Sequence, residues 1–358
     1  MQEEPTLMSE RPATRNARTK AVLITGAGGE MGHGLIQSIS GSYENTPIVA
    51  LDLRPIPNDL ERHCTESVAA DVREVEIFDG LAERYQFTAI YHLAAMLSAS
   101  AERSPFRACD VNIGGTMNLL RIAAAENEHA SSCEETLFFF PSTIAVYGLR
   151  SFEAKRLAGA VSENDCLEPR TIYGCNKLAA EHLGRYFSSH HGQVDRPLDE
   201  AGTIDFRALR FPGLISPHTL PTGGTTDYGP EMLHAAADAR HYECFVRADS
   251  ALPFMTMEEA IRAVLELTAA PRESLSETTY NVRSFAPSAQ DICDTVRTHF
   301  PKHTCSFEPN EGLQAVVDGW PQDTCDQRAQ DDWNWEPTHT LESAFAEELV
   351  PAIVSRNA

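Results

Sequence analysis

Two side chains with complementary acid–base chemistry, Tyr173 and Lys177, lie four positions apart, downstream of the hydroxyl pair Ser142 and Thr143. Residues i and i+4 share one face of a helix, so the phenol and the ammonium can point into the same cleft. A free tyrosine hydroxyl has a pKa of about 10, and a neighbouring cation lowers it. The pair therefore predicts a tyrosine base activated by a lysine. The competing interpretation is an ordinary solvated helix face.

A glycine fingerprint near the N-terminus predicts a dinucleotide site. Gly26, Gly29 and Gly32 form a GxxGxxG pattern directly after the apolar run 21–25 and open the predicted helix 30–40. The three glycines permit a tight turn, a close backbone approach to a pyrophosphate, and close packing of the helix on the strand. The helix N-terminus offers free N–H groups to the phosphates. Together with the Tyr–Lys pair, this pattern predicts hydride transfer between a nicotinamide ring and a secondary alcohol.

An acid twenty residues beyond the last glycine indicates which nicotinamide cofactor is bound. Asp52 ends the predicted strand 47–53, where a carboxylate accepts hydrogen bonds from the adenosine ribose hydroxyls and excludes a 2′-phosphate. This favours NAD over NADP, although Arg54 lies close enough in sequence to hold a phosphate. Each of these residues also has a simpler interpretation. Asp52 could cap a helix, Asp71 could simply be solvated, and Ala94 and Ala95 could be packing residues. The predicted cofactor-lining residues are Gly26, Gly29, Glu30, Met31, Gly32, Asp52, Leu53, Arg54, Asp71, Val72, Leu93, Ala94 and Ala95.

Alternating elements surround these residues and predict an α/β fold with a doubly wound parallel sheet covered by helices on both faces. Strands are expected at 21–25, 47–53, 67–72, 89–93, 137–140 and 203–210, and helices at 30–40, 74–85, 105–128 and 172–190. After residue 215 prolines and glycines crowd the chain, which indicates a smaller substrate-binding region. Its predicted elements are helices at 230–239, 257–269, 288–300 and 341–353 and a strand at 243–247.

The predicted organisation has three parts. Residues 1–19 form a disordered tail, 20–215 a Rossmann domain, and 216–358 a substrate-binding region that partly returns to the main sheet. Residues 150–165 are interpreted as an exposed polar insertion. The tail mixes acids with arginines and lacks the apolar stretch of a secretory signal, and its acids argue against a mitochondrial presequence, so a cytoplasmic location is expected.

Composition limits the partners. The 358 residues carry a formal charge of −23, which repels nucleic acid and anionic membrane surfaces, so neither is expected as a partner. The nine cysteines show no CxxC pair or zinc-finger spacing, which predicts reduced thiols and no metal. Lysines are rare: Lys20, Lys155, Lys177 and Lys302. Adaptation to concentrated salt and ordinary acidity with codon bias both explain this surface.

The combined motifs resemble the extended short-chain dehydrogenase/reductase superfamily, which includes sugar-nucleotide epimerases. In that superfamily the Ser or Thr and the Tyr bind the substrate hydroxyl, and the Lys binds the nicotinamide ribose. The resemblance also implies cofactor contacts for Tyr173, Lys177, Asn112, Pro212, Leu214 and Ile215. Alignment on Val146-Tyr147-Gly148 places Thr143 at the usual hydroxyl position, with Ser142 beside it.

A closer similarity is to the short-chain type of L-threonine 3-dehydrogenases. It covers about residues 20–350 and is most specific at Gly223-Gly224-Thr225-Thr226-Asp227-Tyr228, with support from Phe140 to Gly148, Arg210 to Ser216 and Asp332-Trp333-Asn334-Trp335. The sequence departs from the family in the insertion after Gly148, in the acidic tail and in Asn176, where Ser or Thr is common before the lysine.

This resemblance implies an activity and a set of partners. Tyr173 takes a proton from the threonine hydroxyl, a hydride passes to NAD, Thr143 or Ser142 hydrogen-bonds the developing oxyanion, and Lys177 lowers the tyrosine pKa and holds the ribose. The product is 2-amino-3-oxobutyrate, consumed by a CoA-dependent ligase. Ser98, Thr225, Thr226 and Asp227 are the candidates for holding the amino acid, although Thr225 to Asp227 are also typical helix caps.

A homodimer through helices 105–128 and 172–190 is implied as well. Packing against the core equally explains the apolar residues on one face of these helices. Two rival functions remain open. One is a sugar-nucleotide epimerase or hydroxy-acid dehydrogenase on the same scaffold, and the other is a regulator that senses NAD without turnover.

Overall fold

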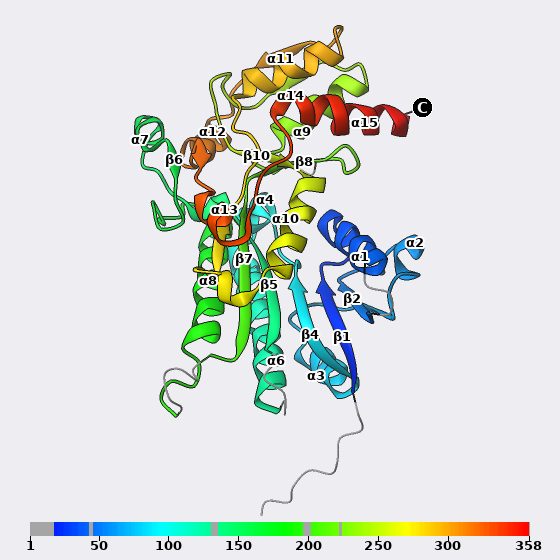
Figure 1. Ribbon diagram of the computed structural model, residues 1–358. Helices are drawn as coiled ribbons and strands as arrows, with labels where there is room; N and C mark the ends of the chain where they lie inside the picture. Colours follow the sequence, from blue (N-terminus) through cyan, green and yellow to red (C-terminus); the bar gives the residue numbers. More distant parts are fainter. Residues whose placement is uncertain (1–17, 43–45, 130–134, 196–201, 222–223, 358) are drawn as a thin grey trace, which may run out of the picture.

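A computed structural model describes residues 18–42, 46–129, 135–195, 202–221 and 224–357. Within these residues the main sheet has seven parallel strands in the order β11-β7-β5-β4-β1-β2-β3 (Figure 1). Their bounds are β1 Thr19–Thr25, β2 Ile48–Asp52, β3 Glu66–Ala69, β4 Tyr85–His92, β5 Thr136–Thr143, β7 Ile204–Phe211 and β11 Thr279–Asn281. The strand order reverses between β1 and β4, and ligands of doubly wound sheets bind at such a point.

Helices cover both faces of the sheet because alternate residues of each strand point to opposite faces. On β5, Phe139 packs with helices α1 (Glu30–Ser42) and α10 (Met257–Ala269). Phe138 and Phe140 pack on the other face, with α3 (Val75–Arg84), α6 (Gly115–His129) and α8 (Ile172–Ser189). These are the two hydrophobic layers expected of a parallel sheet, and the predicted fold class is confirmed.

A third hydrophobic cluster fills the region beyond the carboxyl ends of the strands. The C-terminal helices gather there, at the top of Figure 1. The elements of this region are β8 Gly213–Ile215, α9 Tyr228–Ala237, β9 Tyr242–Cys244, β10 Phe254–Thr256, α11 Ala289–His299, β12 Cys305–Phe307, α12 Glu311–Asp318, α14 Leu341–Ser343, a π-helical turn Ala344–Leu349 and α15 Val350–Asn357. The chain also contributes α10 and β11 to the main sheet layers, so the C-terminal part packs directly on the dinucleotide half.

The remaining elements connect these layers. They are α2 Asn58–Glu61, α4 Ser98–Arg103, α5 Pro105–Cys109, a π-helical turn Asp110–Gly114, a 3₁₀ turn Ile144–Val146, α7 Phe152–Ala158, β6 Ala160–Val161, a 3₁₀ turn Arg272–Ser274, β13 Asp323–Thr324 and α13 Gln327–Trp333. The predicted continuous helix 105–128 is therefore interrupted by a π turn. The predicted helix 341–353 is interrupted in the same way.

The interpretation of residues 150–165 as an exposed polar insertion is only partly right, because most of the segment is exposed but several of its residues are buried. The segment contains helix α7 and strand β6, which pairs with β13. Lys155 and Glu163 within it are buried, and both have hydrogen-bond partners there. The amine of Lys155 donates to the Val317 carbonyl, and Glu163 accepts from the Asn281 N–H. The predicted tail lies outside the described residues as far as position 17. Arg18, the next residue, forms an ion pair with Glu126.

Candidate active site

The glycine loop lies at the carboxyl end of β1 and approaches the end of β4 closely. Gly26 has a φ of +69°, and a Cβ there would lie 2.6 Å from the Ala94 nitrogen. A Cβ on Gly32 would lie 2.6 Å from the Ala27 carbonyl oxygen, so this glycine lets α1 pack tightly on the loop. The first N–H groups of α1 have no partner within the helix, as at every helix start. The loop thus presents backbone donors at the point where the strand order reverses.

Asp52 is held beside this loop at the end of β2. Its carboxylate accepts from the Gly28 N–H at 3.0 Å and from the Arg54 N–H at 3.2 Å. The neighbouring Leu53 leaves 63% of its surface exposed. An adenosine would find a carboxylate for its ribose hydroxyls and an apolar side chain here, so these residues fit an NAD.

Of the next predicted pair, Asp71 is partly buried, with 15% of its side chain exposed, and Val72 is buried. Arg73 pairs with the Asp71 carboxylate at 2.7 Å, and this hydrogen bond lowers the pKa of Asp71. Val72 is buried, and its carbonyl accepts from the Asn118 amide at 3.0 Å. Val72 is therefore a packing residue, and the Asp71 carboxylate lies nearer to the surface.

A chain of buried hydrogen bonds connects the carboxyl ends of β1 and β4 with helix α6. Thr25 and His92 lie 2.8 Å apart, and the other ring nitrogen of His92 lies 3.0 Å from the Thr116 hydroxyl. Burial and the nearby Lys177 charge lower the pKa of His92 to about 3, so the ring is neutral. Sequence reasoning missed Thr25 and Thr116, because a hydroxyl at the end of a strand or inside a helix carries no spacing signal.

Asn112 fixes the loop that follows β4. Its side-chain oxygen accepts from the Met96 N–H at 2.7 Å, and its amide donates to the Met96 carbonyl at 3.0 Å. Because both groups of the amide are used, Asn112 positions the backbone of Leu93, Ala94 and Ala95. Asn112 thus supports the cofactor-lining loop from beneath.

Lys177 is buried under the carboxyl end of β5. Its ammonium donates to the Pro141 carbonyl at 2.6 Å and lies 4.3 Å from the centre of the Phe140 ring. Burial lowers the pKa of Lys177 to about 7, and the nearby Glu181 charge acts in the opposite direction. The ammonium is 5.7 Å from the centre of the Tyr173 ring. The two side chains therefore share one face of α8, as their spacing predicts.

The expectation that Lys177 lowers the pKa of Tyr173 stays a prediction. Burial raises the pKa of Tyr173 above its usual value. The physical reason is that the Lys177 ammonium is directed at a carbonyl and the phenol is desolvated. Burial of the phenol therefore favours its neutral form.

Helix α8 begins at a defined position against β5. Thr171 caps it by accepting from the Gly174 N–H at 3.0 Å, and Glu102 of α4 accepts from the Ile172 N–H at 2.7 Å. A Cβ on Gly174 would lie 2.0 Å from the Ala145 carbonyl oxygen, so only glycine allows this approach. The contact brings Tyr173 to the end of the strand that carries Thr143. Glu102 and Gly174 were not predicted.

Ser142 and Thr143 point in different directions because they are neighbours on a strand. The Ser142 hydroxyl donates to Glu181 in a buried cluster, whereas Thr143 stands at the strand end, where its oxygen accepts from the Ala145 N–H at 3.2 Å. Arg210 clamps Glu181 with two hydrogen bonds of 2.9 and 2.6 Å. Thr143 therefore remains the better candidate for a substrate contact, and Ser142 is a packing group.

The predicted substrate residues lie on two segments over the cleft. Ser98 is the first residue of α4, and Thr225, Thr226 and Asp227 precede α9. Asp227 accepts from the Gly224 N–H at 2.6 Å but makes no side-chain cap on α9, so the loop is held by a local turn.

The segment after β7 joins the two halves. Pro212 and Ile215 are buried, Leu214 is half-buried, and β8 pairs with β10 in parallel register. The Ser216 hydroxyl donates to Glu30, the first residue of α1. The glycine-loop helix is thereby tied to the start of the C-terminal region.

Within the described residues no cluster of three His, Cys, Asp or Glu side chains is arranged to hold a metal ion. Over the same residues, no helix combines the length and apolarity needed to cross a membrane. The eight cysteines described there are free thiols.

Comparison with known proteins agrees with this geometry. The model of the NAD dependent epimerase/dehydratase family matches residues 22–282. The mitochondrial L-threonine 3-dehydrogenase of Bos taurus is 32% identical over 324 residues, covering 89% of this chain and 79% of that protein. Two solved structures are similar along nearly their whole length. A GalE-like L-threonine dehydrogenase from Cupriavidus necator in its holo form has 31% identity and a TM-score of 0.79, covering 94% of this chain and 100% of that one.

The second is a monomeric L-threonine 3-dehydrogenase from a metagenome, with 34% identity and a TM-score of 0.80, covering 93% of this chain and 98% of that one. The family match spans the glycine loop, Asp52, Thr143 and the Tyr173–Lys177 helix. The chain therefore belongs to the NAD-dependent epimerase/dehydratase family, within the extended short-chain dehydrogenases, and is an NAD-dependent oxidoreductase.

Proposed function

We propose that this protein is an L-threonine 3-dehydrogenase, which oxidises L-threonine to 2-amino-3-oxobutyrate in the breakdown of threonine to glycine. The observation that supports the proposal is the Lys177 ammonium 5.7 Å from the centre of the Tyr173 ring, on a helix that Gly174 packs against Ala145, two residues after Thr143. Proteins named for this activity are similar to the chain over about nine-tenths of its length.

Each of the three residues has a distinct role in the proposal. Tyr173 accepts the proton from the threonine side-chain hydroxyl, and Thr143 hydrogen-bonds the same oxygen. Oxidised NAD, when held beside these residues, would supply the acceptor for the hydride. Lys177, held by the Pro141 carbonyl, keeps a cation near the ribose and the ring of Tyr173.

The amino-acid end of threonine needs neutral donors for its carboxylate and an acceptor for its ammonium. Ser98, Thr225 and Thr226 offer hydroxyl donors, and Asp227 offers a carboxylate. Thr225 is buried and is followed by the turn that Asp227 closes. We assign the small substrate to the space between α4 and this turn, where closure of the loop excludes water.

The proposal extends to the surroundings of the enzyme. Phe106 on α5 leaves 86% of its surface exposed and Tyr186 on α8 leaves 43%, which supports a homodimer through these helices. The similar L-threonine 3-dehydrogenase from a metagenome is described as monomeric, so light scattering of the purified protein is the appropriate test of the homodimer.

The described free thiols agree with a reducing, cytoplasmic location. A CoA-dependent ligase is the expected consumer of the unstable product, and coupled assay with that ligase tests this link.

The experiment is a panel of secondary alcohols with NAD and NADP, followed by absorbance of the reduced cofactor. We expect NADH formation with L-threonine, little with NADP, and little with hydroxy acids or UDP-sugars. Preference for a UDP-sugar or a hydroxy acid would identify a different enzyme of the same family. Binding of NAD without turnover of any alcohol would identify a regulator.

The matched control is Tyr173→Phe, which removes one hydroxyl and keeps the ring. Loss of the general base is expected to lower kcat by about 10² to 10⁴-fold while NAD still binds. Wild-type turnover by this variant would rule out Tyr173 as the base.

A further inference from the structure

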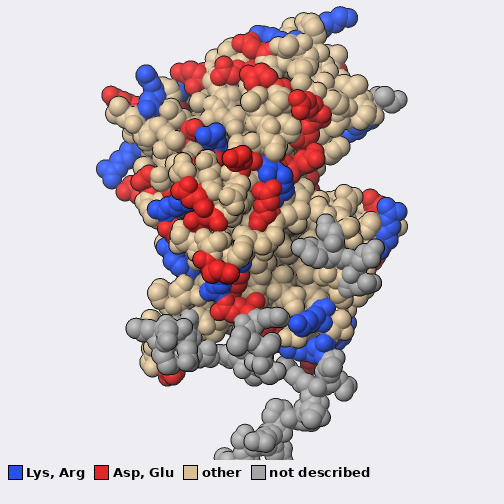
Figure 2. Space-filling model, in the orientation of Figure 1, with Lys and Arg blue, Asp and Glu red and all other residues tan. Residues whose placement is uncertain are grey.

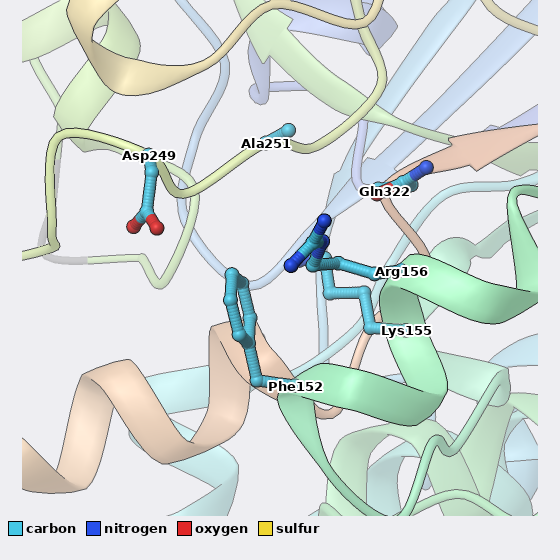
Figure 3. A pocket seen from close by; sticks show the side chains of 6 residues that line it. All are labelled: Phe152, Lys155, Arg156, Asp249, Ala251 and Gln322. Atoms are coloured by element: carbon cyan, nitrogen blue, oxygen red, sulfur yellow. The ribbon is translucent and has the colours of Figure 1, made fainter.

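A cavity of about 300 Å³ lies between helix α7 and the loop that follows β9. It is lined by Phe152, Lys155, Arg156, Asp249, Ala251 and Gln322 (Figure 3). None of the residues assigned above to the cofactor or the substrate lines it. Its volume is at the lower end of the roughly 300 to 1,000 Å³ of small-molecule pockets, so a ligand would be small.

The charges of the cavity are separated. Two cationic side chains, Lys155 and Arg156, come from α7, and in Figure 3 the Asp249 carboxylate lies across the opening from Arg156. Lys155 is 1% exposed, and the described acceptor for its amine is the Val317 carbonyl at 2.9 Å. An ammonium has three donors, so this group retains capacity for an anion.

The third wall is apolar and held in place. Arg247 lies 4.7 Å from the centre of the Phe152 ring and binds Asp318 through two hydrogen bonds of 2.9 and 2.8 Å. Arg247 also pairs with one oxygen of Asp249 at 3.2 Å. Arg247 thus connects the Phe152 ring with the Asp249 carboxylate, whose side chain is 64% exposed and accessible to a ligand.

We propose that this cavity is a second ligand site, and that it takes a small zwitterion of the α-amino-acid class. The carboxylate of the ligand pairs with Lys155 and Arg156, its ammonium pairs with Asp249, and its carbon atoms contact Phe152 and Ala251. A simple anion pairs only with the cations, whereas a zwitterion also places its ammonium beside Asp249, which Arg247 contacts through one of its two oxygens.

The test is hydrogen exchange of the α7 backbone, measured by mass spectrometry on the full-length protein with glycine as the probe. We expect glycine to slow exchange at residues 152–158 in a saturable manner. Acetate and methylammonium, each carrying one half of the charge pattern, should protect at least tenfold more weakly at equal concentration. Inorganic phosphate distinguishes a general anion site, and protection by phosphate or acetate equal to that by glycine would overturn the zwitterion assignment.

Two exposed substitutions test the charge pairing without removing the buried lysine. Arg156→Gln and Asp249→Asn should each weaken the glycine effect at least fivefold. Arg150→Gln is the matched control, because Arg150 lies in the same segment, pairs weakly with Glu168 at 3.5 Å and does not line the cavity. Unchanged protection in Asp249→Asn, or no protection of the wild-type helix by glycine, would overturn the proposal. The peptide covering residues 171–177 reports binding at the active site separately.

Discussion

At the scale of single residues, Thr143 and Ser142 separate a substrate contact from a structural one. Thr143→Val removes a hydroxyl from the strand end and should lower kcat by about 10² to 10³-fold, as expected for loss of one donor to a developing oxyanion. Ser142→Ala should keep kcat and lower the free energy of unfolding by about 1–3 kcal/mol, because it removes a buried hydrogen bond to Glu181.

Initial rates and urea titrations of both variants check this assignment. Thr143→Ser serves as the control, since it retains the hydroxyl and should retain most of the turnover. The assignment is reversed if Ser142→Ala loses turnover while Thr143→Val keeps it.

His92 makes stability depend on pH. Its folded-state pKa of about 3 lies below the usual 6.5, so between these values the unfolded chain binds a proton that the folded chain does not. Stability is therefore complete above pH 6.5 and is lost as the pH falls toward 3. Between pH 7 and 5 the expected loss from this residue is about 2 kcal/mol.

Urea titrations at both pH values, on the wild type and on His92→Gln, measure this effect. The variant lacks the titrating ring, so its stability should fall by about 2 kcal/mol less than that of the wild type. Equal losses in the two proteins would show that His92 is not a buried neutral base.

At the scale of elements, the position of helix α8 depends on a glycine. A methyl group at Gly174 would lie 2.0 Å from the Ala145 carbonyl oxygen, so Gly174→Ala must displace α8 or the turn after β5. Near-attack geometry tolerates displacements of well under 1 Å, and we expect kcat/KM to fall by about 10²-fold or more.

Gly80→Ala is the matched control for this prediction. Gly80 also lies inside a helix, α3, but a Cβ there meets nothing within 4 Å. Alanine should raise stability by roughly 0.5–1 kcal/mol at this site through its higher helix propensity and leave turnover unchanged. Equal turnover in the two variants would contradict a positioning role for the α8 contact.

The elements differ in how well the sequence predicts them. The strand–glycine–helix unit and the Tyr–Lys helix were predicted because their spacing follows local backbone geometry. The cluster of Glu181, Arg210 and Tyr147 was missed, because its members meet only after β5, β7 and α8 have packed. Lys155 is the clearest failure: a lysine in a polar segment indicates exposure, and its acceptor lies 162 positions away at Val317.

At the scale of the whole molecule, the C-terminal region is not an independent lobe. A Cβ on Gly34 of α1 would lie 1.9 Å from the Ile261 side chain of α10, and Ser216 donates to Glu30 at the start of α1. Strand β11 then extends the main sheet beside β7. Movement of the substrate loop is therefore expected at residues 216–221 and 224–227 rather than as a hinge between two bodies.

The net charge of −23 predicts that salt stabilises the whole protein. Acidic side chains gather on the face shown in Figure 2, with basic groups scattered among them. Their repulsion acts over about 10 Å at 0.1 M salt and over about 3 Å at 1 M. Exposed ion pairs such as Arg121–Asp79 are worth only about 0–1 kcal/mol each. The stability lost when salt weakens these pairs should therefore be smaller than the stability gained when salt screens the repulsion between acids.

Thermal unfolding in increasing NaCl, from about 0.05 to about 1 M, tests this expectation. The midpoint should rise by roughly 1–2 °C for each kcal/mol of repulsion removed. Sucrose is the control, because it is excluded from the protein surface without screening charge. A rise in NaCl well beyond that in sucrose, accompanied by higher activity, indicates a protein suited to concentrated salt. A midpoint that does not respond to NaCl would mean that the excess acids are spaced too widely to repel one another, and ordinary acidity would then explain the composition.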